Sequence, residues 1–189
     1  MAGRWRFVFV VLANLITFGR ILAVPLVVWL LGTGRYEGAF LVFVAAGLSD
    51  AVDGLLAKRF DAVTELGAHL DPVADKALLV SVYLTMGQIG MVPAWLVILV
   101  VFRDALIVGG VLFMRFLSYS VEMAPLLVSK VNTAMQIALA ALVLADRAFD
   151  LAADGPVHAL ALAVAATTFA SGAAYSMVFW RTLLDQARR

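Results

Sequence analysis

Two pairs of aspartates with helical spacing lie in one short stretch of a largely apolar chain. Asp50 and Asp53 are three residues apart, and Asp71 and Asp75 are four residues apart. If each pair lies on a helix, which turns about 100° per residue, both members of the pair share one helix face. Four carboxylates that converge in an apolar environment require either that some are protonated or that cations lie between them. The spacing therefore points to a cation site.

The chemistry of these ligands indicates which ion and which reaction to expect. Ligands that are all oxygen atoms favour Mg²⁺ or Mn²⁺ over zinc or copper, and two such ions held together recur in phosphoryl chemistry. Gly54, Ala57 and Gly67 stand among the aspartates, and their small size lets a ligand or a neighbouring backbone approach closely. The alternative is a set of packing glycines and helix-terminal aspartates, which the number of matching positions argues against.

Membrane-spanning helices are expected to position these residues. The chain has 189 residues, of which 64% are hydrophobic and 14% charged, and a spanning helix needs about 20 apolar residues. This composition predicts a single all-α domain over residues 1–189, a polytopic membrane bundle of six transmembrane helices with an N-terminal amphipathic lead-in. The expected spans are Asn14–Leu31, Tyr36–Arg59, Ala68–Met86, Met91–Met114, Lys130–Ala145 and Val157–Trp180.

The second and third spans carry the aspartates, and the short polar loop from Asp61 to Glu65 lets their two faces meet. Pro72 lacks a backbone donor and is therefore expected in the first turn of the third span. That position would place Asp71 and Asp75 near the membrane surface, on the same side as the first aspartate pair.

Charge and cysteine content exclude several classes of protein. The absence of cysteine excludes disulfide scaffolds, zinc–cysteine sites and thiol catalysis, and a net charge of +1 offers no basic surface for nucleic acid.

With six spans, most basic residues outside the membrane fall on the side of both termini, which predicts that this side is cytoplasmic and that the aspartates face it. No Arg/Ser-rich transit segment precedes the first span, which favours the bacterial inner (cytoplasmic) membrane.

The pattern Asp50-x2-Asp53-Gly54-x2-Ala57-Lys58-x8-Gly67-x3-Asp71-x3-Asp75 resembles the signature of the CDP-alcohol phosphatidyltransferases. The resemblance covers nearly the whole chain, including the lead from Asn14 to Arg20. It implies a six-helix membrane enzyme, usually a homodimer, which displaces CMP from a CDP-linked lipid with an alcohol. It also implies two divalent ions, Mg²⁺ or Mn²⁺, as cofactors.

Carried over position by position, the resemblance assigns a role to each residue of the pattern. Asp75 would be the catalytic base for the attacking hydroxyl. The metal ligands would be Asp50, Asp53, Asp71 and Asp75, and the residues contacting CDP would be Asp50, Asp53, Gly54, Ala57, Lys58, Gly67 and Asp71. Lys58 replaces the usual arginine and offers a point charge without the bidentate fork. Direct in-line attack requires fewer assumptions than an aspartyl-phosphate intermediate.

Polar residues of the fourth and fifth spans are candidates for binding the acceptor alcohol. Arg103 interrupts the apolar fourth span, and Lys130 and Asn132 lie at the start of the fifth. Arg103 and Lys130 are expected to hold an anionic phosphate of the acceptor. The alternative is a local pair of Arg103 with Asp104, with Lys130 extending to the membrane surface.

These stretches resemble the cardiolipin synthases that join CDP-diacylglycerol to phosphatidylglycerol. Asn132 stands where phosphatidylglycerophosphate synthases, which use glycerol 3-phosphate, more often have a second lysine. The loss of this cation favours an acceptor with one diester charge, so phosphatidylglycerol is preferred and glycerol 3-phosphate is the alternative. The partners implied are CDP-diacylglycerol and an anionic lipid or phosphorylated alcohol, within the membrane.

Other mechanisms fit the sequence less well. Phospholipase-D-like cardiolipin synthases need His-x-Lys motifs, and neither His69 nor His158 belongs to one. An ion-coupled transporter, the remote alternative, would predict repeat symmetry and broken helices around a midplane site, and the sequence has neither. A scaffold without activity has no use for four buried acids.

Overall fold

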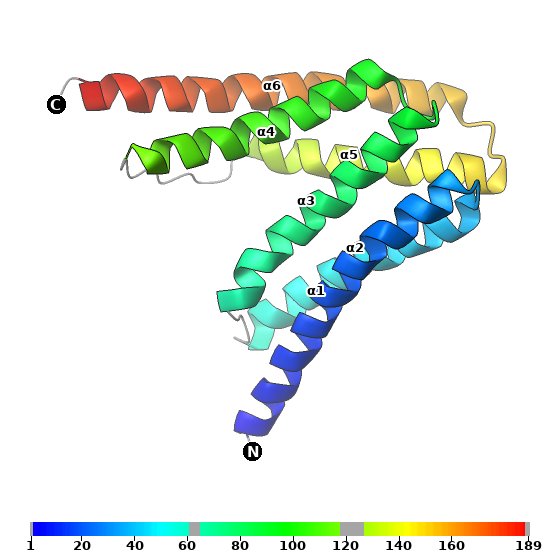
Figure 1. Cartoon of the computed structure of the whole chain (residues 1–189), viewed down its shortest axis with the longest axis horizontal. Coiled ribbons are helices and arrows are strands. Elements are labelled where there is room, and N and C mark those ends of the chain that lie inside the picture. Colours follow the sequence, from blue (N-terminus) through cyan, green and yellow to red (C-terminus); the bar gives the residue numbers. More distant parts are fainter. Residues whose placement is uncertain (1, 61–64, 118–126, 188–189) are drawn as a thin grey trace. The chain divides into compact units, whose positions relative to one another are not determined.

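The computed structural model describes the backbone of residues 2–60, 65–117 and 127–187, and within these the side chains of 16–50, 74–114, 116–117 and 127–184. All regular structure in the described residues is helical (Figure 1). The helices are α1 (Ala2–Gly32), α2 (Tyr36–Phe60), α3 (Glu65–Gln88), α4 (Ala94–Phe116), α5 (Leu127–Phe149) and α6 (Asp154–Ala187). The prediction of an all-α fold with six helices is confirmed.

The helix boundaries differ from the predicted spans at two places in the N-terminal half, in α1 and at the start of α3. The lead-in and the first predicted span form one continuous helix, α1, which runs through Pro25. The helix α3 begins at Glu65, about two turns before Pro72, so the prediction that Pro72 lies in the first turn is wrong. The residues before it, such as Leu66 and Ala68, are good helix formers. A single missing donor is tolerated where neighbouring helices surround the chain.

Glycines with positive φ end α1 and α3. Gly34 has φ +73° and Gly90 has φ +75°, a conformation that side chains with a Cβ rarely adopt. After α1, the Arg35 N–H donates to the Leu30 carbonyl at 2.8 Å, and the Gly34 N–H donates to the Leu31 carbonyl at 3.1 Å. The same pair of bonds closes α3. This arrangement satisfies carbonyls that the last helical turn leaves unpaired, so both helices end sharply and the chain can reverse.

Long apolar stretches in the described part of the chain fit a membrane. Three of its helices are long and apolar enough to cross one, over Ala94–Met114, Leu127–Phe149 and Asp154–Leu184, and Ile16–Gly32 is a shorter apolar helix. Many large apolar side chains on these helices are exposed, for example Phe116 and Phe169. In water such a surface would promote association, whereas lipid accepts it. The chain is therefore an integral membrane protein.

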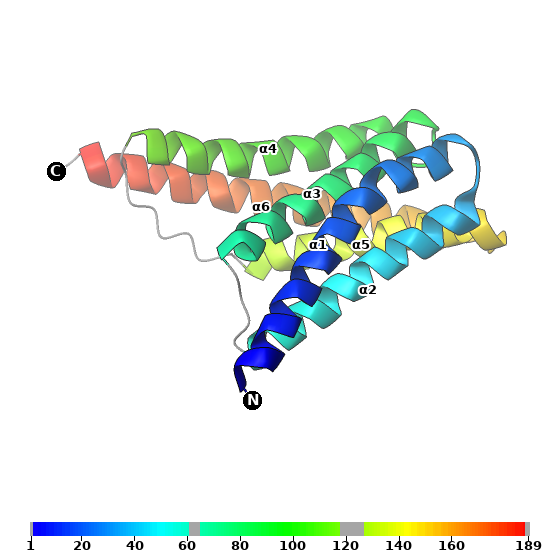
Figure 2. The ribbon, with the colours of Figure 1, turned by 60° about the horizontal axis from the view of Figure 1, so that its bottom comes forward.

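The described residues form two compact units. The first comprises residues 1–91 and 141–152, and in it α1 packs along both α2 and α3 (Figure 2). Its buried side chains come from α1, α2, α3 and the last turns of α5, and include Val27, Phe43, Val82 and Leu144. At one edge the rings of Phe40 and Phe149 meet edge to face, with centroids 5.4 Å apart.

The second unit comprises residues 92–140 and 153–189, and its closest packing is between α4 and α6. Gly110 on α4 lies at this contact, and a Cβ at this position would overlap the ring of Phe179 on α6. At the neighbouring Gly109 an added Cβ would meet no other described atom within 4 Å. Small residues let helices approach closely where no hydrophobic effect drives their association. The absence of a side chain at Gly110 therefore leaves room for the Phe179 ring against α4.

Replacing Gly110 with leucine should lower the free energy of unfolding by about 1–3 kcal/mol, because the Phe179 ring must leave its place against α4 to make room. Reversible unfolding in detergent micelles, followed by circular dichroism, measures this change. Gly109→Leu is the matched control, with the same gain in helix propensity but no neighbour to displace. Equal effects of the two substitutions would show that the α4–α6 contact does not depend on Gly110.

Candidate functional site

In the first unit, Arg20 on α1 joins two of the predicted metal ligands. Its Nη2 lies 2.8 Å from Oδ1 of Asp50 on α2, and its Nη1 donates to Oδ1 of Asp75 on α3 at 2.5 Å. The arginine side chain is only 1% exposed, whereas the Asp50 and Asp75 side chains are 41% and 43% exposed. The two carboxylates thus meet over a buried cation and still open to their surroundings.

The neighbours of Arg20 explain why a charged residue is stable in an apolar helix. Burying a guanidinium is costly unless carboxylates lie close enough to compensate its charge. The planar guanidinium has donors in a fixed fork, and here the two Nη atoms engage carboxylates on two different helices. Thr17, one turn earlier on α1, is buried as well. One polar face of α1 is therefore turned toward α2 and α3.

The donor chemistry of Asp50 and Asp75 fits a divalent ion. Both supply hard carboxylate oxygens, the ligands that Mg²⁺ or Mn²⁺ prefers, and they reach the same guanidinium from two different helices. Among the residues that the structure describes, no group of three or more metal-ligating side chains gathers. The other two predicted ligands, Asp53 and Asp71, have side chains outside the described set.

The remaining residues of the predicted CDP site also lie where side chains are not described: Gly54, Ala57, Lys58 and Gly67. Their backbone belongs to α2 and α3, the two helices that carry Asp50 and Asp75. The structure thus brings Asp50 and Asp75 together, and the roles of the other residues stay predictions.

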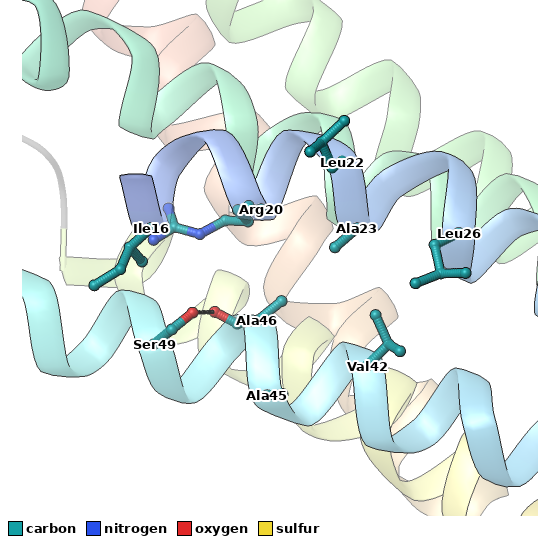
Figure 3. A pocket seen from close by; sticks show the side chains of 10 residues that line it. Ile16, Arg20, Leu22, Ala23, Leu26, Val42, Ala45, Ala46 and Ser49 are labelled. Carbon is teal, nitrogen blue, oxygen red and sulfur yellow. Dashed lines mark hydrogen bonds between the residues drawn. The ribbon is translucent and has the colours of Figure 1, made fainter. Parts of the chain in front are cut away.

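An apolar pocket of about 470 Å³ lies between α1 and α2, beside the ion pairs. Figure 3 shows its lining side chains, which come from α1 on one side and α2 on the other. Arg20 and Ser49 line one end, and Leu26 and Val42 line the other (Figure 3). The Ser49 hydroxyl donates to the carbonyl of Ala46 within its own helix at 2.8 Å. The pocket therefore combines a charged end with an apolar length, which suits an amphiphilic ligand.

In the second unit, Arg103 on α4 is held by side chains from three helices. Its Nε and Nη2 donate to the hydroxyl of Ser171 on α6, at 3.1 Å and 2.6 Å. Its Nη2 also donates to the hydroxyl of Ser129 on α5, and its Nη1 pairs with Asp104 at 2.6 Å. The structure therefore contains the Arg103–Asp104 pair that the sequence offers as an alternative to acceptor binding. The guanidinium links α4, α5 and α6.

Asn132 is the second buried polar group of this unit. It is completely buried, and its Oδ1 accepts hydrogen bonds from Thr167 at 2.9 Å and Thr168 at 2.8 Å. Among the described residues, its Nδ2 has no hydrogen-bond partner. An unsatisfied buried donor is costly, so this amide is a candidate to donate to a ligand or a water molecule. Lys130, two residues earlier, is exposed, and acceptor binding by Arg103, Lys130 and Asn132 stays a prediction.

Sequence reasoning missed several polar partners. It left Arg20 without a role, and it gave no role to Ser171, Thr167 or Thr168, which hold Arg103 and Asn132. An arginine inside an apolar segment needs compensating groups, so Arg20 signalled that acidic partners exist. Serines and threonines are common on membrane helices, and nothing in their spacing identified these three.

Comparisons with known proteins agree with the pattern of aspartates. A family model described as CDP-alcohol phosphatidyltransferase matches residues 10–178. A cardiolipin synthase (CMP-forming)/mitochondrial hydrolase fusion protein from Schizosaccharomyces pombe is 33% identical over 179 residues, which cover 87% of this chain and 30% of that protein. Cardiolipin synthase (CMP-forming) from Homo sapiens is 29% identical over 178 residues, covering 86% of this chain and 59% of the relative.

A relative named for another activity is equally similar. The chloroplastic CDP-diacylglycerol–glycerol-3-phosphate 3-phosphatidyltransferase 1 from Oryza sativa subsp. japonica is 33% identical over 195 residues, covering 94% of this chain and 59% of the relative. The chain thus spans between 30% and 59% of the length of these three relatives. The similarity does not separate the two acceptors.

Replacing Ser171 with alanine should lower the free energy of unfolding by about 1–3 kcal/mol, because a buried guanidinium loses the acceptor of two of its hydrogen bonds. Ser176→Ala on the same helix is the control, since the Ser176 hydroxyl is exposed and donates to the Gly172 carbonyl within its own helix. Its effect should stay within about 0.5 kcal/mol. If both variants unfold alike in detergent micelles, the Arg103–Ser171 contact does not stabilise this unit.

Proposed function

Since this chain belongs to the CDP-alcohol phosphatidyltransferase family, we propose that it transfers a phosphatidyl group from CDP-diacylglycerol to an alcohol and releases CMP. The acceptor that we propose is phosphatidylglycerol, and the product is then cardiolipin. One observation carries the proposal. Asp50 and Asp75, from two consecutive helices, both pair with Arg20, and their side chains stay partly exposed. Such paired carboxylates are what a cation-assisted transfer of a phosphoryl group requires.

Two divalent ions, Mg²⁺ or Mn²⁺, are the cofactors of this proposal, held by Asp50, Asp53, Asp71 and Asp75. When bound, such ions polarise the diphosphate and stabilise the negative charge that develops on the departing CMP. Asp50 and Asp75 fit this role, because their carboxylates converge and remain partly exposed. Asp75 also accepts the proton of the attacking hydroxyl, a task for a carboxylate that reaches the reacting oxygen.

Further residues near the aspartates bind and orient the substrate. Gly54, Ala57 and Gly67 leave room for the cytidine diphosphate, and Lys58 offers a charge to its phosphates. The apolar pocket beside Arg20 is suited to an acyl chain of the same lipid, because its length is apolar and its charged end lies next to the carboxylates. In this way the lipid and nucleotide parts of one substrate reach the same group of helices.

The choice of phosphatidylglycerol rests on Asn132. A neutral amide at this position adds no positive charge where a lysine would. A diester with one negative charge needs less compensation than a phosphomonoester. The similarity to the Oryza sativa glycerol-3-phosphate enzyme favours the second candidate, synthesis of phosphatidylglycerophosphate.

The setting of the reaction follows from charge and family. We place the active site on the cytoplasmic face of the membrane, because most basic residues outside the expected spans fall on that side. A homodimer is the expected assembly, by resemblance to the family.

Purified protein in detergent micelles should release CMP from CDP-diacylglycerol and form cardiolipin when phosphatidylglycerol is present. Glycerol 3-phosphate and inositol phosphate, offered in parallel, should give little product. EDTA should abolish CMP release, and Mg²⁺ or Mn²⁺ should restore it. Product formed only with glycerol 3-phosphate would establish the second candidate. Full activity in rigorously metal-free buffer would refute the role assigned to the aspartates.

Asp75→Asn should reduce the rate of CMP release by about 100-fold to 10,000-fold, the usual contribution of a general base. The amide keeps the shape of the side chain and an oxygen for Arg20, so the protein should still fold. Asp154→Asn, at the exposed start of α6, is the matched control and should stay near wild type. A folded Asp75→Asn variant with near-normal CMP release would exclude Asp75 as the base.

A further inference from the structure

We propose that the guanidinium of Arg20 competes with divalent ions for the carboxylates of Asp50 and Asp75. The inference rests on the proposed function, because it concerns the same two carboxylates. Arg20 is then a positioning residue that gathers the carboxylates while no ion is bound and weakens the binding of ions. The sequence pattern of the aspartates does not include it.

The guanidinium contacts both of the described carboxylates that would hold an ion. Its two Nη atoms each lie within 2.8 Å of a different carboxylate, one from α2 and one from α3. Both contacts use Oδ1 of the aspartate. The guanidinium is attached to the core of the first unit through a side chain that is 1% exposed, so it has little freedom to move away. An ion that binds Asp50 and Asp75 therefore does so next to a fixed positive charge.

The contact with Arg20 has two opposing effects on the free energy of ion binding, and one is larger than the other. Arg20 holds the carboxylates together and so reduces the entropy lost when an ion binds, but this concerns only the rotamers of two short side chains. Arg20 also repels the ion, and this repulsion acts between a unit charge and a double charge at close range. The repulsion is the larger effect. Removing the charge of Arg20 should thus tighten ion binding.

Binding of Mn²⁺ to the full-length protein in detergent micelles, without lipid substrate, tests this inference. The signal of free Mn²⁺ in electron paramagnetic resonance reports the fraction bound. Arg20→Gln should lower the Kd for Mn²⁺ by at least about tenfold. Arg20→Lys keeps the charge but loses the fork, so one carboxylate is released and the Kd should lie between those of wild type and Arg20→Gln.

Controls separate this inference from the proposed function. Arg35→Gln removes an exposed arginine that stacks on Trp29, and it should leave the Kd unchanged. Asp50→Asn should weaken binding, which shows that the ion is at the carboxylates. If wild type binds no Mn²⁺, the metal site itself is wrong and the inference falls with it.

If wild type binds Mn²⁺ and Asp50→Asn does not, the metal site at the carboxylates is supported, and the remaining variants test the role of Arg20. A folded Arg20→Gln protein with an unchanged or higher Kd would then overturn the inference, and this is also the result that a merely structural role predicts. Circular dichroism and size-exclusion chromatography establish folding. If Arg20→Gln aggregates, Arg20→Lys decides in its place: a lower Kd supports competition, and an equal or higher Kd refutes it.

Discussion

Burying a guanidinium costs several kcal/mol unless its charge is compensated nearby, and the ion pairs of Arg20 meet this requirement in the first unit. They join α1 to α2 through Asp50 and to α3 through Asp75. In lipid, apolar side chains give helices little reason to prefer one orientation over another, and specific polar contacts supply that preference. Arg20 thus fixes how the three helices face one another, and it gathers two carboxylates at the same time.

The second unit uses the same constraint with different partners. Arg103 obtains its compensation from Asp104 and from the hydroxyls of Ser129 and Ser171, while Asn132 lies between threonines of α6. These contacts orient α4, α5 and α6, and Gly110 allows α4 and α6 to come close. Stability and chemistry draw on the same polar groups, because each one that is buried must be paired with a partner or a ligand.

Hydropathy and the spacing of aspartates predicted much of this arrangement. The polar loop between two apolar segments led to the prediction that the two aspartate pairs face each other, because the side-chain faces follow from helical geometry. Of these four side chains the structure describes Asp50 and Asp75, and both pair with Arg20. The start of α3 was wrongly predicted from Pro72, since a proline in a helix loses one bond that surrounding helices can offset. The contacts of Arg20 and Ser171 depend on how the helices pack, and the period of a single helix does not contain that information.

The central claim is that α2 and α3 together hold two divalent ions with their four aspartates. An experimental structure of the protein with Mn²⁺, with the ions located by anomalous scattering, tests it most directly. The account predicts two peaks between these helices, each about 2.0–2.3 Å from carboxylate oxygens, with Asp50 and Asp75 among the ligands. Side chains of Asp53 and Asp71 that turn away from Asp50 and Asp75, with no peak between the helices, would contradict it.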